Sequence, residues 1–144
     1  MGRGYDRAAD VRRRTRGERV TEKPTPREQM EWDLLISAVE GGIGYWSTCH
    51  SYRWRDDDGV DCAPSVVVVP DDEDPIVVTA ADIAKAVRQI VKSKQDGEPI
   101  KFVSEDTYRA ILDAVRDPEN ADNDAGVADQ VFQLAALGGE IVYG

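Results

Sequence analysis

The sequence has few of the side chains on which metal sites and catalytic dyads depend: two cysteines and one histidine among 144 residues. Structural zinc sites usually present paired ligands about two to four residues apart. Cys49 and His50 are instead adjacent, so on an extended strand they would point to opposite faces. We therefore expect neither a metal nor a cofactor, and we interpret both cysteines as free thiols of a cytoplasmic protein.

Long apolar runs and nucleotide-binding motifs are missing too. No stretch approaches the roughly 20 apolar residues that cross a bilayer, so we expect no membrane partner. The Arg-rich start has no apolar core of a secretory signal. Without a phosphate-binding loop or a dinucleotide fingerprint, Gly41-Gly42-Ile43-Gly44 is interpreted as the end of a helix. Ser47 and Ser51 lack the context of a nucleophile elbow. No catalytic constellation is recognisable, which favours a protein that is not an enzyme.

Charge is divided unevenly along the chain, whose formal net charge is −10. Up to Arg27, nine basic residues stand against four acidic ones; from Glu28 onward, nine stand against twenty-four. We expect a disordered basic leader over residues 1–24 and a single acidic domain over residues 25–144. Because an acidic domain repels nucleic acid, any contact with a phosphate backbone would go through the leader.

Hydrophobic periodicity predicts an α+β fold, in which a small, mostly antiparallel sheet of three to five strands packs with about four helices. The first helix should begin after the N-cap Thr25 and end at Gly41-Gly42, where glycine tolerates the left-handed conformation. Three further helices should follow caps at Thr79, at Ser104 and at Asp122 or Asp124. The stripe that the first helix buries is predicted to be Trp32, Leu35, Ile36 and Val39.

Strands are expected at 43–54, 65–69 and 76–78, and short strand-like segments occur at 100–103 and 140–144. The run Ser65-Val66-Val67-Val68-Val69 is β-branched and does not alternate with polar residues. Such a continuous run suggests burial on both faces, so we expect this strand to be the central one.

Rare side chains concentrate between Glu40 and Trp54, which holds two of the three Trp, two of the five Tyr and the only His. Strict alternation along a strand separates two sets. One face would carry Ile43, Tyr45, Ser47, Cys49 and Ser51, and the other would carry Trp46, Thr48, His50, Tyr52 and Trp54. The second face is aromatic, and Arg53 and Arg55 flank its end.

Three partners for this aromatic face remain open. Helices of the same chain would make it part of the core. A second copy would make it a homo-oligomer interface. A planar nucleobase stacked between the rings, with Arg on its phosphate, would make it a ligand pocket. The candidate ligand or interface residues are Glu40, Tyr45, Trp46, His50, Tyr52, Arg53 and Trp54.

Parts of residues 30–144 resemble small uncharacterised proteins from bacteriophages of high-GC bacteria. The segments that carry the resemblance are Glu40-Gly41-Gly42-Ile43-Gly44-Tyr45-Trp46, the helix start at 78–83, and 124–144. In that family a Glu-Gly-Gly-x-x-Tyr-Trp segment recurs with a terminal Gln-x-x-x-x-Gly-Glu-x-x-Tyr-Gly segment. Here Gln133 to Gly144 is one residue longer before Glu140. The resemblance implies a phage protein of the host cytoplasm and supplies no activity.

Three hypotheses about function follow. The first is a non-enzymatic phage-type binding protein that sequesters a small host metabolite or signalling nucleotide, or blocks a host protein. The second is a small nucleotide-processing or metabolic enzyme with its acid and base among Glu40, His50 and the Asp residues. The third is an antagonist of a host protein whose carboxylates mimic nucleic acid, although the helices carry Lys on their outer faces.

Overall fold

The structure, a computed structural model, describes residues 23–71 and 73–144. The predicted leader therefore lies almost wholly outside the described residues. The elements are α1 (Pro26–Ser37), a π-helical turn (Ala38–Gly42), β2 (Ser47–Arg55), β3 (Asp61–Pro70), β4 (Ile76–Thr79), α2 (Ala80–Asp96), α3 (Glu105–Arg116), a 3-10 turn (Pro118–Asn120) and α4 (Ala125–Ala136).

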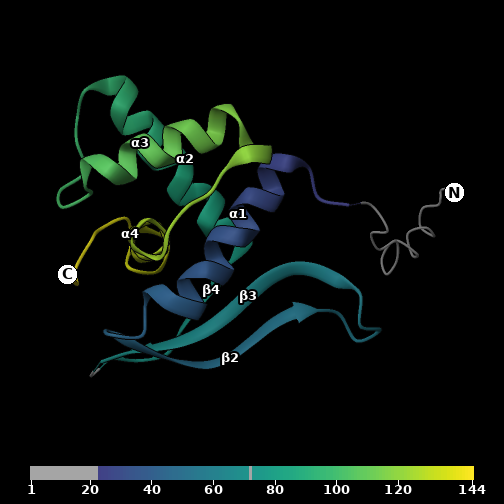
Figure 1. The fold of residues 1–144 in the computed structure, drawn as a ribbon. Helices are drawn as coiled ribbons and strands as arrows, with labels where there is room; N and C mark the ends of the chain where they lie inside the picture. The colour runs from purple at the N-terminus through teal and green to yellow at the C-terminus, as the bar shows by residue number, and fades with distance from the viewer. Residues whose placement is uncertain (1–22, 72) are drawn as a thin grey trace, which may run out of the picture.

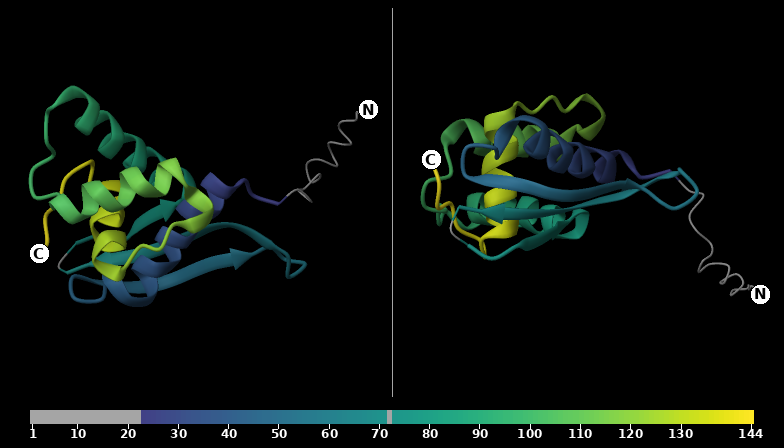
Figure 2. Two further views of the ribbon diagram at one scale, coloured as in Figure 1. Left: turned by 45° about the horizontal axis from the view of Figure 1, so that its top comes forward. Right: turned by 90° about the horizontal axis from the view of Figure 1, so that it is seen from below.

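The three strands form an antiparallel sheet in the order β2-β3-β4, so the Val-rich β3 is central as predicted. All four helices lie on one side of this sheet (Figures 1 and 2). Val66, Val68 and Val78 are buried against them, together with the apolar faces of the helices. The predicted α+β class is confirmed, with four helices and a sheet of three strands among the described residues.

The predicted N-caps are present. Thr25 accepts a hydrogen bond from the backbone N–H of Glu28, whose carboxylate accepts in return from the N–H of Thr25. Thr79 and Asp82 form the same reciprocal pair at the start of α2. Asp124 accepts from the N–H of residue 127 at 2.9 Å and begins α4. Short polar side chains thus satisfy the orphan amides at the helix starts.

The end of the first helix differs from the prediction. The helix widens into the π-helical turn, in which the N–H of Ile43 bonds to the carbonyl of Ala38. Gly42 does not take a positive φ. A Cβ there would instead come within 2.8 Å of the carbonyl oxygen of Ala125, so close approach to α4 requires the glycine. Leu34 and Leu35 are buried, whereas Trp32, Ile36 and Val39 of the predicted stripe are only half-buried.

The prediction of short strands at 100–103 and 140–144 is wrong. At 100–103 the chain turns, and Phe102 has a φ of 70°. The N–H of Ile100 donates to the hydroxyl of Tyr108 at 2.7 Å instead of to a neighbouring strand. The segment 140–144 also joins no strand; Gln133 of α4 binds the backbone of Val142 and Tyr143 instead, as described below. Within residues 23–71 and 73–144 no helix has the length and hydrophobicity of a membrane span.

Candidate functional site

Tyr45 and Trp46 lie in a turn before β2, not in the strand that was predicted to start at Ile43, and both reach α4. The indole Nε1–H of Trp46 donates to Oδ1 of Asp129 at 2.9 Å, and the Tyr45 hydroxyl donates to Oδ2 at 2.6 Å. Tyr143 stacks on the Trp46 indole, with ring centroids 4.8 Å apart and planes 8° from parallel. With Gln133, these four residues form what we call the Asp129 cluster.

Gln133 is fully buried and holds the segment around Tyr143 in place. Its Oε1 accepts from the backbone N–H groups of Val142 and Tyr143 at 2.9 and 2.8 Å. Its Nε2 donates to the carbonyl of Tyr143 at 2.9 Å and to Asp129 at 3.1 Å. One side-chain amide thus replaces the strand partner that this segment was predicted to find.

The chemistry of the Asp129 cluster is that of a structural anchor. Asp129 is 7% exposed, and no ion pair among the described residues includes it. Three neutral donors satisfy its carboxylate instead. Although Tyr45 is 58% exposed as a whole, partial burial at its hydroxyl, and next the hydrogen bond to Asp129, raise its pKa to about 12. A phenol that retains its proton this firmly acts as a donor near neutral pH, not as a general base.

A β-bulge at His50 changes the predicted aromatic face. Cys49 pairs with Val68, but Ser51 pairs with Val67, so His50 is an extra residue in β2. Beyond the bulge the alternation is shifted by one residue. Tyr52 pairs with the buried Val66 and therefore lies on the side of the sheet that carries the helices. The predicted face of Trp46, Thr48, His50, Tyr52 and Trp54 is therefore wrong.

Tyr52 and Trp54 still form a pair of rings, with centroids 4.7 Å apart and planes tilted by 37°. Trp54 is half-buried against the core, whereas Tyr52 is 62% exposed. Arg53 pairs with Ser65 on the opposite face of the sheet, and its guanidinium is 3.7 Å from Asp57. Arg53 and the rings, which the nucleotide hypothesis placed together, are thus on different sides of the sheet.

The other predicted residues do not join either group. Glu40 is exposed in the π-helical turn, and His50 is exposed on the bulge. Cys49 is exposed and Cys62 half-buried, both as free thiols. Among the residues that the structure describes, no group of three or more His, Cys, Asp or Glu side chains is arranged to hold a metal ion.

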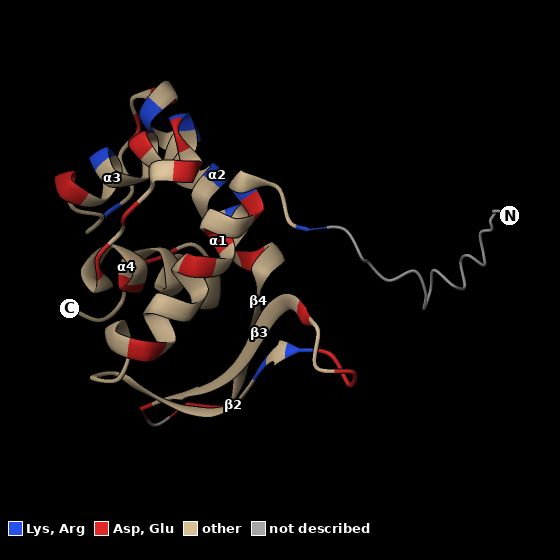
Figure 3. Ribbon diagram, turned by 45° about the vertical axis from the view of Figure 1, so that its right-hand side comes forward, with Lys and Arg blue, Asp and Glu red and all other residues tan. Residues whose placement is uncertain are grey.

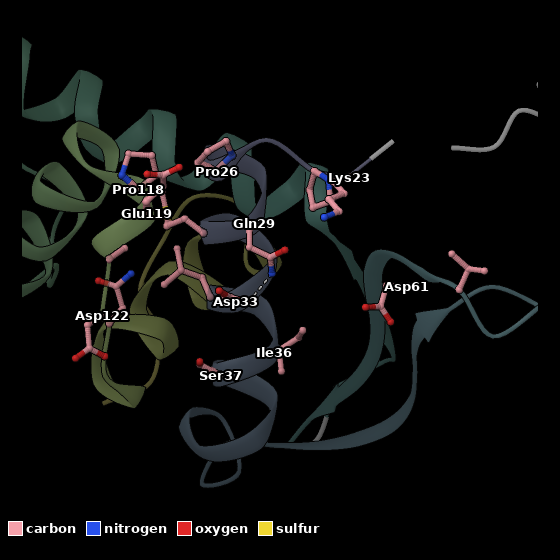
Figure 4. A pocket seen from close by; sticks show the side chains of 16 residues that line it. Lys23, Pro26, Gln29, Asp33, Ile36, Ser37, Asp61, Pro118, Glu119 and Asp122 are labelled. Carbon is pink, nitrogen blue, oxygen red and sulfur yellow. Dashed lines mark hydrogen bonds between the residues drawn. The ribbon is translucent and has the colours of Figure 1, made fainter. Parts of the chain in front are cut away.

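A groove of about 860 Å³ runs over α1 and is a candidate binding site (Figure 4). α1 forms its floor, with Gln29 and Asp33 directed into it. The loop at 118–123 forms one wall, and Asp61 at the start of β3 stands on the other. Tyr52 and Trp54 lie on this side of the sheet, although neither ring lines the groove.

Negative charge dominates the groove. Its lining includes four carboxylates, from Asp33, Asp61, Glu119 and Asp122, and one basic side chain, Lys23. Asp61 is paired with an arginine of β2 outside the lining, at 2.9 Å. The other three carboxylates take part in no ion pair with the described residues. The groove is therefore suited to a positively charged occupant and repels an anion.

Sequence reasoning missed Asp129, Gln133 and the groove. The polar pair was detectable, because Asp129 and Gln133 are four residues apart on a helix whose neighbouring positions are apolar. The groove joins residues from three separate segments and leaves no local pattern. Comparisons with models of protein families, with curated proteins and with solved structures found no match to this chain.

Proposed function

We propose that this protein is a non-enzymatic binding protein whose groove over α1 holds a basic, partly apolar segment of another protein. The observation that carries the proposal is the groove itself, in which four carboxylates and one lysine lie beside the accessible apolar side chains of Pro26, Ile36 and Val60. Carboxylates around an apolar floor match a peptide that presents Lys or Arg beside aliphatic side chains.

Half of the residues that line the groove are polar or charged. Pockets for small ligands are mostly apolar, with few polar groups. A nucleotide would also bring its phosphates close to Asp33, Glu119 and Asp122. These points favour blocking of a host protein over capture of a signalling nucleotide. A phage origin and a cytoplasmic location, both implied by the sequence, remain predictions.

Binding of two labelled peptides tests the proposal by fluorescence anisotropy. One peptide alternates Lys with Leu, and the matched one alternates Glu with Leu. The Lys peptide should bind and the Glu peptide should not, and added salt should weaken the binding. Asp33→Asn with Asp122→Asn should raise Kd roughly fivefold or more, at about 0.5–1 kcal/mol for each charge removed.

The control is Glu73→Gln with Asp74→Asn, which removes the same charge from an exposed turn outside the groove. Its Kd should stay within about twofold of wild type. Equal weakening by both double variants would mean that peptide binding depends only on the net charge of the protein. That result would refute the groove as the binding site. Tight binding of a mononucleotide that is lost in Trp54→Ala would instead support the ring-stacking alternative.

A further inference from the structure

The helices cover only one face of the sheet. Val66 and Val78 are buried beneath them, at 1% and 0% exposure. On the other face, their neighbours Val67 and Val77 pair across β3 and β4, and Val77 is 63% exposed. No described segment lies on this second side of the sheet (Figures 1 and 2).

The strand register defines the members of this face. Val67 stands at its centre, between Ser51 on β2 and Val77 on β4. Small hydroxyl side chains surround the valines. We call these eight residues the outer face: Thr48, Ser51, Arg53, Ser65, Val67, Val69, Val77 and Thr79.

The sequence of the strands is typical of a sheet that is covered on both sides. A sheet with one solvated face usually alternates apolar with polar residues along each strand. The run 66–69 of β3 is instead valine throughout, and Ile76-Val77-Val78 of β4 does not alternate either. No segment among residues 23–71 and 73–144 supplies the cover that this pattern predicts for the apolar residues of the outer face.

Charge favours a second copy of this chain as the cover. From Glu28 onward the chain has nine basic and twenty-four acidic residues. The outer face has one charged side chain, Arg53, and Asp57 lies beside it at 3.7 Å. In Figure 3 the strands are mostly free of charged residues, which gather in the turns and on the helices. None of the eight residues of the outer face is Asp or Glu, so two copies that meet here do not bring carboxylates of this face against each other.

The chain outside the described residues is a poorer match. Residues 1–22 contain seven Arg and, after Met1, only three larger apolar residues: Tyr5, Val11 and Val20. This composition suits an acidic surface better than a neutral, apolar one.

We propose that two copies of the protein pack outer face to outer face around a twofold axis, with Val67 and Val77 at the centre. Such an isologous contact needs a self-complementary surface, which a neutral patch of valine and hydroxyl side chains provides. From the strand spacing and the rise per residue, the three strands present a projected area on the order of 350 Å². A standard interface buries roughly 800 Å² per partner, so this contact is small and we expect a weak dimer whose population rises with protein concentration.

Sedimentation equilibrium of the full chain, from low to high micromolar concentration, tests the proposal. Wild type should approach twice the 15.9 kDa chain mass as its concentration rises. Val77→Glu and Ser51→Glu each place two carboxylates in the contact and should weaken the dimer more than about tenfold. Val142→Glu is the matched control, because Val142 is 60% exposed and lies outside the sheet. Circular dichroism verifies that each variant is folded, and Ser51 lies on an edge strand that tolerates the change.

The dependence on salt concentration distinguishes dimerisation through the outer face from peptide binding in the groove. The dimer should tighten as salt screens the repulsion between two acidic bodies, whereas binding of the basic peptide in the groove should weaken. A chain that stays monomeric throughout the concentration range would overturn the proposal. So would a dimer that Val142→Glu weakens as much as Val77→Glu does, because the contact would then lie elsewhere.

Discussion

Replacement of Asp129 by Ala is the most direct test of how the fold is held together. Asp129 joins α4 to the turn before β2 through Trp46 and Tyr45, and it also accepts from Gln133. Alanine removes all three acceptor contacts while it preserves the helix.

The expected loss of stability in Asp129→Ala depends on whether each of the three donors finds another acceptor. The Trp46 indole is 1% exposed, so its N–H would stay buried without an acceptor, at a cost of about 1–3 kcal/mol. Gln133 would still donate to the carbonyl of Tyr143. Tyr45 is exposed enough for its hydroxyl to donate to water in place of the carboxylate. We expect a total loss of about 2–4 kcal/mol, out of the roughly 5–15 kcal/mol typical of a domain.

Urea unfolding followed by far-ultraviolet circular dichroism measures the loss, and Asp129→Asn is the control. Asparagine retains an oxygen for the Trp46 N–H and should cost less than about 1 kcal/mol. If the alanine variant remains within about 0.5 kcal/mol of wild type, the Asp129 cluster is not the anchor that its geometry indicates. If asparagine costs as much as alanine, the charge matters and not the acceptor.

Three further substitutions have defined outcomes. Gly42→Ala should lower the free energy of unfolding by about 1–3 kcal/mol, measured by thermal unfolding, because its Cβ would overlap the start of α4. The control is Gly44→Ala, whose Cβ would have nothing within 4 Å and which should be nearly neutral. Equal effects of the two variants would contradict the close approach of Gly42 to α4. Folding raises the pKa of Tyr45 from 10.0 to about 12, so its contribution to stability is complete below pH 10 and is lost as the pH rises toward 12. The advantage of wild type over Tyr45→Phe in urea titrations should shrink across that window, and a constant gap would argue against the bond to Asp129. His50→Ala should change stability by less than about 0.5 kcal/mol, since the side chain is exposed; a larger loss would show that the bulge depends on it.

Local chemistry made much of the fold predictable from the sequence. The caps at Thr25, Thr79 and Asp124 satisfy backbone groups within three residues, so short-range pattern is sufficient to find them. The central position of β3 followed from its run of valines. These features depend on residues that are close together along the chain.

The features that were missed depend on partners far away in the sequence. The bulge at His50 results from pairing with β3, and strict alternation could not anticipate the extra residue. Gly42 is required by contact with α4, more than eighty residues later, and not by its own backbone angles. Two of the three segments that carry the phage resemblance do meet, because Trp46 stacks on Tyr143, but the sequence did not indicate that Asp129 of the last segment binds Trp46.

The Asp129 cluster also has a consequence for synthesis of the protein. Trp46 is translated long before α4 and Tyr143, yet its indole N–H donates to Asp129 and its ring packs against Phe132 and Tyr143. While the ribosome is still translating α4, the nascent chain exposes an unpaired tryptophan and an incomplete core. The domain therefore completes its fold only after the segment around Tyr143 has left the exit tunnel, and a ribosome that stalls before that point leaves a chain for proteases to remove.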